Sequence, residues 1–262
     1  MKLINFDQNN RMSFPERKKR IIETVYLSGS LSVLALARKL KISPATIRRD
    51  LHSIAEEGLL TRTHGGVMKL DDRPLTSFSG KQSANGQAKQ EIGRIAAGLV
   101  RDGDTIFMDC GSTVFTMCPH LKKMNGLTVV TNSLPVVAEL MDSPVQINLI
   151  GGELDKGLMA AHGQKALDHI GSYHADKAFL GVDGLTPENG LMASGEKEAT
   201  ITKAFAANAD SVYLLCDSSK IGRNAYMKFG PLSMIGHLLT DKGLHAGLKK
   251  ALIKKGLKIH IA

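Results

Sequence analysis

Short apolar runs alternate with amphipathic helical segments along residues 88–262, and this alternation constrains the fold most. Apolar residues recur at i, i+3, i+4, i+7 and i+8 from Ile92 to Val100, which predicts a helix there. Strands and helices that alternate in this way predict an α/β, Rossmann-like domain with a largely parallel sheet. The expected strands are 105–109, 127–131, 145–150, 177–182, 211–216, 236–240 and 257–261, and the expected helices lie near 134–142, 163–170, 196–208 and 245–255.

Polar clusters follow the expected strands. Ligands of parallel α/β sheets bind beyond the carboxyl ends of the strands, so these clusters are candidates for a binding site. Glycines, hydroxyl groups and helix starts suit a phosphate, whereas Asp, Asn and Glu suit sugar hydroxyls. Each cluster alone is more often a turn or a helix cap, but their recurrence favours a site. The clusters are Asp109-Cys-Gly111-Ser112-Thr113, Thr131-Asn132-Ser133, Gly151-Gly152-Glu153, Gly181-Val-Asp183-Gly184, Ser194-Gly-Glu196-Lys-Glu198 and Asp217-Ser-Ser-Lys220.

The N-terminal part of the chain is strongly basic. Residues 1–70 hold 13 Lys and Arg against 6 Asp and Glu, a net charge of +7, whereas residues 71–262 hold 21 against 19, a net charge of +2. A basic segment beside a nearly neutral body indicates a polyanionic partner, such as nucleic acid, for that segment. Charge alone leaves a merely basic, soluble surface as an equal alternative.

Three short helices are predicted within this basic segment. Residues 13–16 have capping-box spacing at the start of the first helix, which ends at Gly29. Ser32 is the expected N-cap of the second helix. Ser43 and Pro44 supply the N-cap and first-turn proline of the third, which stops at Gly58.

The third helix has an apolar side and a polar side. At ~100° per residue, Ile47, Leu51 and Ile54 form one stripe that is expected to face the other two helices. Small polar residues and arginines opposite such a stripe suit insertion into the major groove of DNA. A solvent-facing helix is the alternative, although such a helix more usually mixes Glu and Lys on that side. The expected DNA contacts of this helix and its cap are Ser43, Ala45, Thr46, Arg48, Arg49 and His52.

A hairpin is predicted after the third helix. Residues 59–64 alternate in polarity, Gly65 and Gly66 form a turn, and residues 67–70 return. Three helices and a hairpin predict a winged helix-turn-helix over residues 14–70, with double-stranded operator DNA as its partner. Arg62 and His64 on the wing are expected to contact phosphates.

Composition excludes several other classes of protein. With 43% hydrophobic and 23% charged residues the chain is globular, and no apolar run approaches the ~18 residues of a membrane-spanning helix. The start lacks the apolar stretch of a secretory signal, so we expect a cytoplasmic protein without membrane contact. Three scattered cysteines and no histidine motif predict no disulfide framework, metal or cofactor. Residues 71–87, rich in Ser, Gly, Asp and Asn, are predicted to link the winged helix-turn-helix to the α/β domain at 88–262.

Several segments resemble the DeoR family of bacterial transcription regulators, and the resemblance covers nearly all of residues 14–262. Phe78, Lys81, Asn85 and Lys89 also keep a spacing similar to that of the family's linker, so part of the linker is expected to be ordered. The segments that carry the resemblance are Arg17-x3-Ile21-x3-Val25, Ser43-Pro-Ala-Thr46-Ile-Arg48-Arg49-Asp50-Leu51, Glu57-Gly-Leu-Leu-Thr-Arg-Thr-His64-Gly65-Gly66, Val129-Val-Thr-Asn-Ser133, Ala175-Asp-Lys-Ala-Phe-Leu-Gly181 and Asp217-Ser-Ser-Lys220.

The resemblance implies a sensor domain similar in fold to ribose-5-phosphate isomerase, with a phosphorylated sugar as effector. Residues 111–113 would hold the effector phosphate. Cys110 and Val114 stand where the family usually has hydroxyl residues, which leaves the identity of the sugar open. The expected effector-binding residues are Asp109, Gly111, Ser112, Thr113, Asn132, Gly152, Asp183, Glu198 and Lys220.

Two functions remain open on the sequence. The first is a repressor of a sugar-utilisation operon that is controlled by a phosphorylated sugar, acts as a homo-oligomer (dimer or tetramer) and is not an enzyme. The second is a sugar-phosphate isomerase-type enzyme with an accessory nucleic-acid-binding segment, because Asp183, Glu198 and Lys220 offer acid and base types. A base-reading helix and a wing favour the regulator, since an isomerase needs neither.

Overall fold

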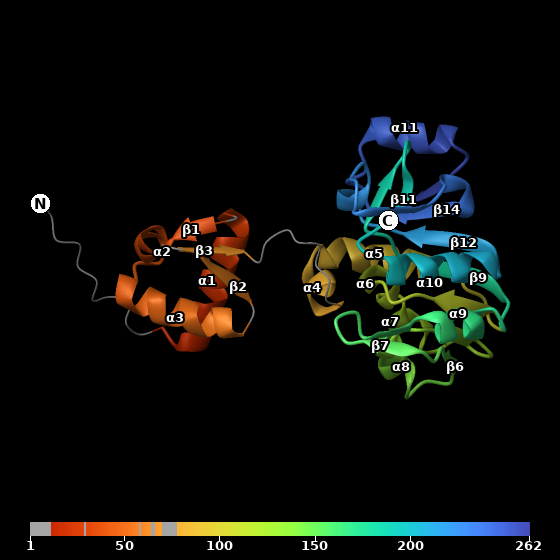
Figure 1. The fold of residues 1–262 in the computed structure, drawn as a ribbon, viewed down its shortest axis with the longest axis horizontal. Coiled ribbons are helices and arrows are strands. Elements are labelled where there is room, and N and C mark those ends of the chain that lie inside the picture. Colours follow the sequence, from red (N-terminus) through yellow and green to blue (C-terminus); the bar gives the residue numbers. More distant parts are fainter. Residues whose placement is uncertain (1–11, 29, 58, 64–65, 70–77) are drawn as a thin grey trace, which may run out of the picture. The chain divides into compact units, whose positions relative to one another are not determined.

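The chain divides into two compact units, Met1–Arg73 and Pro74–Ala262 (Figure 1). The computed structural model describes residues 12–28, 30–57, 59–63, 66–69 and 78–262. Buried side chains of each unit pack into cores of their own. Among the described residues, no helix has the length and apolar character that a membrane crossing requires.

The smaller unit combines the three predicted helices with a three-stranded antiparallel sheet of order β1-β3-β2. Its helices are α1 (Phe14–Ser28), α2 (Val33–Leu40) and α3 (Pro44–Glu56), and its strands are β1 (Ser30–Ser32), β2 (Leu60–Thr63) and β3 (Gly66–Lys69). The predicted stripe of Ile47, Leu51 and Ile54 is buried in the core, which confirms the inward side of α3. The predicted wing is present as the antiparallel pair β2 and β3. Strand β1 was not predicted.

The helix starts of the smaller unit follow the predicted capping chemistry. Ser32 Oγ accepts a hydrogen bond from Ala35 N at 3.1 Å, at the start of α2. Ser43 Oγ accepts one from Thr46 N at 3.2 Å, at the start of α3, and Pro44 occupies the first turn. Both serines satisfy a backbone N–H that the helix itself leaves unpaired, so the sequence determines where α2 and α3 start.

A seven-stranded sheet forms the centre of the larger unit, and every neighbouring pair of its strands is parallel. All seven predicted strands are present within a few residues of their expected places, which confirms the α/β fold class. In sheet order they are β15 (Lys258–Ile261), β14 (His237–Thr240), β12 (Ala209–Leu215), β9 (Ala175–Leu180), β4 (Thr105–Met108), β5 (Thr128–Thr131) and β6 (Gln146–Leu149).

Helices cover both faces of this sheet. Side chains alternate along each strand, so Ile106 and Met108 of β4 enter one core whereas Phe107 enters the other. The core of Ile106 includes residues of α5 (Gly86–Ala97), α6 (Ser112–Phe115), α7 (Cys118–Leu121) and α8 (Leu134–Leu140). The core of Phe107 includes residues of α9 (Gln164–Ile170), α10 (Glu196–Ala207) and α11 (Ala246–Lys254).

Smaller elements that were not predicted complete the larger unit. A three-stranded antiparallel sheet joins β10 (Gly184–Thr186), β11 (Gly190–Ala193) and β13 (Met227–Gly230), and a hairpin joins β7 (Glu153–Asp155) and β8 (Ala160–His162). Part of the predicted linker is ordered, as expected, and forms helix α4 (Phe78–Ser83) within the larger unit. The boundaries at residues 70 and 88 stay a prediction.

The strand order reverses between β4 and β9. From β4 the chain adds β5 and β6 on one side, and from β9 it adds β12, β14 and β15 on the other. The segments that leave the carboxyl ends of β4 and β9 therefore diverge, which opens a crevice at that edge of a parallel sheet.

Candidate functional sites

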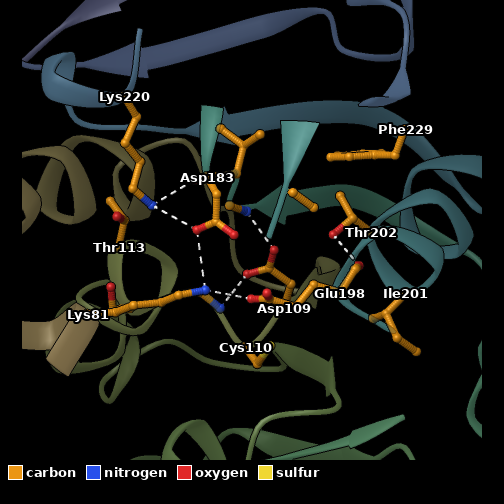
Figure 2. A pocket seen from close by; sticks show the side chains of 15 residues that line it. Lys81, Asp109, Cys110, Thr113, Asp183, Glu198, Ile201, Thr202, Lys220 and Phe229 are labelled. Carbon is orange, nitrogen blue, oxygen red and sulfur yellow. Dashed lines mark hydrogen bonds and ion pairs between the residues drawn. The ribbon is translucent and has the colours of Figure 1, made fainter. Parts of the chain in front are cut away.

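A pocket lies at this strand-order reversal, between the segments that follow β4 and β9 (Figure 2). It encloses about 520 Å³ of unoccupied space, its mouth included. Lys81 and Phe229 also contribute to its wall, although the strand-end pattern did not predict them, and so does Cys110 of the first strand-end cluster. Seven of the predicted effector-binding residues line it, namely Asp109, Gly111, Ser112, Thr113, Asp183, Glu198 and Lys220.

Asp109 fixes the two backbone segments at the floor of the pocket. Its Oδ1 accepts from Gly111 N at 2.7 Å, and its Oδ2 accepts from Gly181 N at 2.5 Å. A Cβ at position 111 would lie 2.8 Å from Asp109 Oδ1, so this close approach requires glycine. Burial raises the pKa of Asp109 to about 6, although the two N–H donors act against the shift.

A cluster of ion pairs crosses the pocket. Lys81 Nζ lies 2.7 Å from Glu198 Oε1 and 3.3 Å from Asp183 Oδ1, and Lys220 Nζ lies 3.6 Å from Asp183 Oδ1. Figure 2 shows these side chains converging from opposite walls. Burial alone would raise the pKa of Asp183, but Lys81 and Lys220 outweigh it and the pKa falls to about 2. Burial likewise acts to lower the pKa of Lys81, which Glu198 and Asp183 nevertheless raise. Asp183 and Lys81 are therefore both charged at neutral pH.

A buried lysine supports the pocket from behind. Lys89 lies on the apolar side of α5, in register with Ile92 and Ala96, and only 2% of it is exposed. Its Nζ donates to Ser112 Oγ at 3.1 Å and to the carbonyl oxygen of Lys81. Burial, followed by repulsion from Lys220, lowers the pKa of Lys89 to about 8. The sequence signal that could have identified it is a lysine within an otherwise apolar helical stripe.

The pocket has the chemistry of a site for a polar anion. Three lysines lie in or directly behind its wall, beside the hydroxyl groups of Ser112 and Thr113, and these groups can donate to phosphate oxygens. Asp183 and Glu198 can accept from hydroxyl groups. Within the part of the chain that the structure describes, no group of three or more His, Cys, Asp or Glu could hold a metal ion.

Two predicted effector-binding residues are not among those that line the pocket. Asn132 is buried, and its Nδ2 donates to Ala161 O at 3.0 Å. A Cβ at Gly152 would lie 2.5 Å from His162 O, which places Gly152 against β8, the strand that also contains Ala161. The hairpin of β7 and β8 covers the segments that follow β5 and β6. Asn132 and Gly152 therefore help to hold this hairpin against the sheet.

The outward side of α3 is the candidate DNA-reading surface. Ala45, Arg48, Arg49 and His52 are exposed on it, as predicted, and Thr46 is half-buried. The hydroxyl group of Ser43 is engaged as the helix cap and also lies 2.9 Å from Thr46 Oγ1.

For the two predicted wing residues, Arg62 and His64, the structure gives less information than for the residues of α3. Arg62 lies in β2, where its backbone is opposite Val67 of β3. His64 falls outside the described residues.

A salt bridge fixes α3 against α1. Arg17 Nε donates to Asp50 Oδ2 at 2.8 Å, and Arg17 Nη2 donates to Asp50 Oδ1 at 3.1 Å. Asp50 is only 3% exposed, and Arg17 Nη1 also donates to Met12 O at 2.6 Å. Two parallel hydrogen bonds restrict rotation of the helix about its axis, so this pair positions the outward side of α3.

Comparison with known proteins identifies the family of both parts of the chain. Residues 17–73 match the family model of the DeoR-like helix-turn-helix domain, and residues 84–242 match that of the DeoR C terminal sensor domain. The chain is 31% identical over 229 residues to the HTH-type transcriptional repressor GlcR of Bacillus subtilis, covering 87% of this chain and 88% of that protein. It is 33% identical over 234 residues to the glycerol-3-phosphate regulon repressor of Escherichia coli, covering 88% of this chain and 92% of that protein.

The chain also has a distant likeness among solved structures. Ribose 5-phosphate isomerase A from Methanocaldococcus jannaschii is 22% identical, with a TM-score of 0.40, over 53% of this chain and 55% of that one. The family assignment does not depend on this likeness. Because the two domain models match consecutive parts of the sequence and the relatives align over most of its length, the chain belongs to the DeoR family of DNA-binding transcription regulators.

Proposed function

We propose that this regulator represses a sugar-utilisation operon and that a phosphorylated sugar in the pocket controls its affinity for operator DNA. The observation that carries the proposal is the pocket itself, in which lysines, hydroxyl groups and carboxylates meet at the strand-order reversal. Both relatives compared above are named repressors, and one is named for a glycerol-3-phosphate regulon. The name of the second relative contains a phosphorylated compound, which supports a phosphorylated effector for this chain.

The geometry divides the pocket between the two ends of such an effector. We propose that the phosphate lies against Gly111, Ser112 and Thr113, where Lys89 and Lys220 supply positive charge. Asp183 and Glu198 would accept hydrogen bonds from the sugar hydroxyls. Asp109 keeps the loop in place through its backbone contacts. Asn132 and Gly152 are left out of this contact set.

We propose that α3 reads the operator in the major groove. Arg48 and Arg49 are exposed opposite the buried stripe, and neighbouring Ala45 permits close approach to base edges. Thr46 and His52 would complete the contacts, with Ser43 contributing mainly by capping the helix. Arg62 and His64 of the wing would contact phosphates. The protein would act as a homo-oligomer, either a dimer or a tetramer, which presents paired reading helices to repeated half-sites.

The test measures operator binding by the full-length protein. Fluorescence anisotropy reports its binding to the DNA that lies upstream of its own gene. Sugar phosphates that raise the thermal unfolding midpoint, as a bound ligand should, are then added at saturation. We expect the operator Kd to change about 5- to 150-fold, the usual range of allosteric coupling. An operator Kd that no sugar phosphate changes would contradict control by this class of effector.

The same measurement tests the reading helix. Arg48→Ala and Arg49→Ala are each expected to weaken operator binding by roughly 1–3 kcal/mol. Arg20→Ala is the matched control, because Arg20 carries the same charge on α1, where its nearest ion-pair partner is Glu16. Unchanged operator affinity of the Arg48→Ala, Arg49→Ala double variant would refute the assigned surface.

A further inference from the structure

Helix α4 connects the pocket with the start of the larger unit. The chain leaves the DNA-binding unit between Arg73 and Pro74, and α4 is the first described element beyond that point. One of its side chains, Lys81, lines the pocket. Other lining residues, such as Asp109, Asp183 and Lys220, come from segments after β4, β9 and β12, deeper in the same unit. A change at Lys81 therefore occurs close in sequence to the DNA-binding unit.

Lys81 provides polar attachments of α4 through both its side chain and its main chain. Its Nζ pairs with Glu198 at the start of α10 and with Asp183 after β9. Its carbonyl oxygen accepts from the buried Nζ of Lys89. Phe78 supplies a further attachment, because its N donates to Gly157 O at 2.8 Å and its ring meets that of Phe115 at 5.4 Å between centroids.

We propose that Lys81 is an effector-binding residue that transmits occupancy of the pocket to the DNA-binding unit. The inference rests on the proposed function. In the structure, Lys81 is shared by two carboxylates. An entering phosphate attracts its ammonium group and repels Glu198 and Asp183, since all these charges lie within one partly buried site. Lys81 exchanges its carboxylate partners for the phosphate, and both carboxylates become available to the sugar hydroxyls. The attachment of α4 therefore differs between the empty and the occupied pocket.

Lys81 stays positively charged when it exchanges the carboxylates for the phosphate, so the exchange is driven by electrostatic attraction. The two carboxylates raise the pKa of Lys81, so the side chain is cationic at neutral pH while it contacts them, and a phosphate supplies negative charge in their place. Lys89 holds the adjacent carbonyl oxygen and also contacts Ser112 of the proposed phosphate loop. A phosphate at this loop therefore acts on α4 at two neighbouring points, the side chain and the main chain of Lys81.

Lys220 provides a matched control within the same pocket. It also lines the wall, approaches Asp183 Oδ1 at 3.6 Å and donates to Val182 O at 2.7 Å. It lies in a short 3₁₀ turn, Ser218–Lys220, after β12, and the neighbouring Ser218 is held by Asp241. Its loss removes one cation from the pocket, and neither of these two contacts is with a residue of α4.

The experiment compares full-length wild type, Lys81→Met, Lys81→Arg and Lys220→Met. The probes are glycerol 3-phosphate, D-fructose 1-phosphate, D-glucose 6-phosphate and D-ribose 5-phosphate, and the one with the largest thermal shift on wild type is used throughout. Isothermal titration gives the probe Kd of each variant. Anisotropy then gives the operator Kd without probe and at a probe concentration that saturates that variant, and the ratio of the two is the coupling factor.

We expect Lys81→Met and Lys220→Met both to bind the probe more weakly. At saturation, Lys220→Met should keep the wild-type coupling factor within about twofold, whereas that of Lys81→Met should fall to within about twofold of 1, against about 5–150 for typical coupling. Lys81→Arg, which retains the cation, should restore most of the coupling. A purely structural role of Lys81 would lower stability without abolishing the coupling at saturation. Wild-type coupling in Lys81→Met would overturn the inference.

If Lys81→Met binds no probe, its coupling factor cannot be measured, and a second measurement tests the inference instead. Hydrogen exchange of wild type should then show altered protection of peptides within residues 78–97 when the probe is bound. Unchanged exchange there, together with normal coupling in wild type, would also overturn the inference. If no sugar phosphate binds wild type or changes its operator Kd, the proposed function fails first and takes this inference with it. Coupling that survives in Lys81→Met sinks the inference alone.

Discussion

Asp109 shows how a single buried carboxylate can shape the pocket. Each of its two oxygens accepts from a different backbone N–H, one after β4 and one after β9, so it joins the segments that diverge at the strand-order reversal. Burial raises its pKa from 3.8 to about 6, against the effect of those two donors. The folded protein therefore binds this proton more tightly than the unfolded chain does, and folding stability depends on pH through this residue.

The sign of this dependence follows from the direction of the shift. Because the folded-state pKa lies above the unfolded value, the contribution of Asp109 to the free energy of unfolding is present below about pH 4 and is lost as the pH rises through about 6. A shift of about two units corresponds to roughly 3 kcal/mol. Asp109→Asn removes this contribution, so the stability advantage of wild type over the variant should shrink by about that amount between pH 4 and pH 7, as measured by urea unfolding.

Asp241→Asn is the control for this prediction. Burial acts to raise the pKa of Asp241, but hydrogen bonds from Ser218 and Gly243 outweigh it and lower the pKa. Its titration therefore falls below pH 4, and the difference between wild type and this variant should stay constant from pH 5 to pH 7. A constant difference for Asp109→Asn over pH 4–7 would show that the carboxyl does not titrate there.

The sequence predicted most of the pocket because it lies at strand ends. Asp109, Asp183 and Lys220 each follow a strand of a parallel sheet, and the carboxyl ends of such strands meet at one edge. Lys81 and Lys89 precede β4, the first strand of that sheet, so the same argument could not reach them. The argument also placed Asn132 and Gly152 in the site, because it did not include the β7–β8 hairpin that covers them.

At the scale of elements, the orientation of α3 depends on its salt bridge to α1. Asp50→Ala leaves the guanidinium of Arg17 without its bidentate partner, and loss of one member of a buried pair typically costs 3–5 kcal/mol. Because Arg17 is partly exposed, we expect a loss of about 2–3 kcal/mol in the smaller unit. The measurement is urea unfolding of the fragment 1–73, monitored by circular dichroism.

The matched control is Glu16→Ala. Glu16 pairs with Arg20 at 4.0 Å on the exposed side of α1, a contact expected to contribute less than about 0.5 kcal/mol. Equal losses for Asp50→Ala and Glu16→Ala would mean that the buried pair does not hold α3. In the full chain, Asp50→Ala should also weaken operator binding, because the reading helix is no longer fixed.

Element length explains why several of the small strands were not predicted. The helices and strands that form the two faces of the large sheet carry a full hydrophobic period, and all seven of its strands were predicted. The strands β1, β7, β8 and β10 contain three residues each, too few to show alternation. Their pairing is set by distant partners, as when Leu31 of β1 lies opposite Val67 of β3. Local sequence cannot contain that information.

At the scale of the whole molecule, the proposed DNA reading belongs to the smaller unit and the proposed effector sensing to the larger unit. The described core of the smaller unit and the two described cores of the larger unit share no residue. The basic charge is concentrated in residues 1–70, with the candidate reading helix. A winged helix-turn-helix reads only a short half-site, so high specificity requires two of them, held at a fixed separation by the assembly.

This requirement predicts a dependence on the helical phase of the DNA. If the larger units assemble the reading helices into pairs, operator half-sites should bind best when their centres lie about 34 Å apart, or at multiples of that repeat. Insertion of about 5 base pairs between the half-sites turns one of them to the opposite side of the duplex and should weaken binding by the full-length protein, whereas insertion of about 10 should restore it. The fragment 1–73 contains the reading helix but not the larger unit, so its binding should not vary with spacing. Band-shift titrations over a series of spacings measure both. Spacing-independent binding by the full chain would show that each unit reads DNA alone, and the proposed pairing would then be wrong.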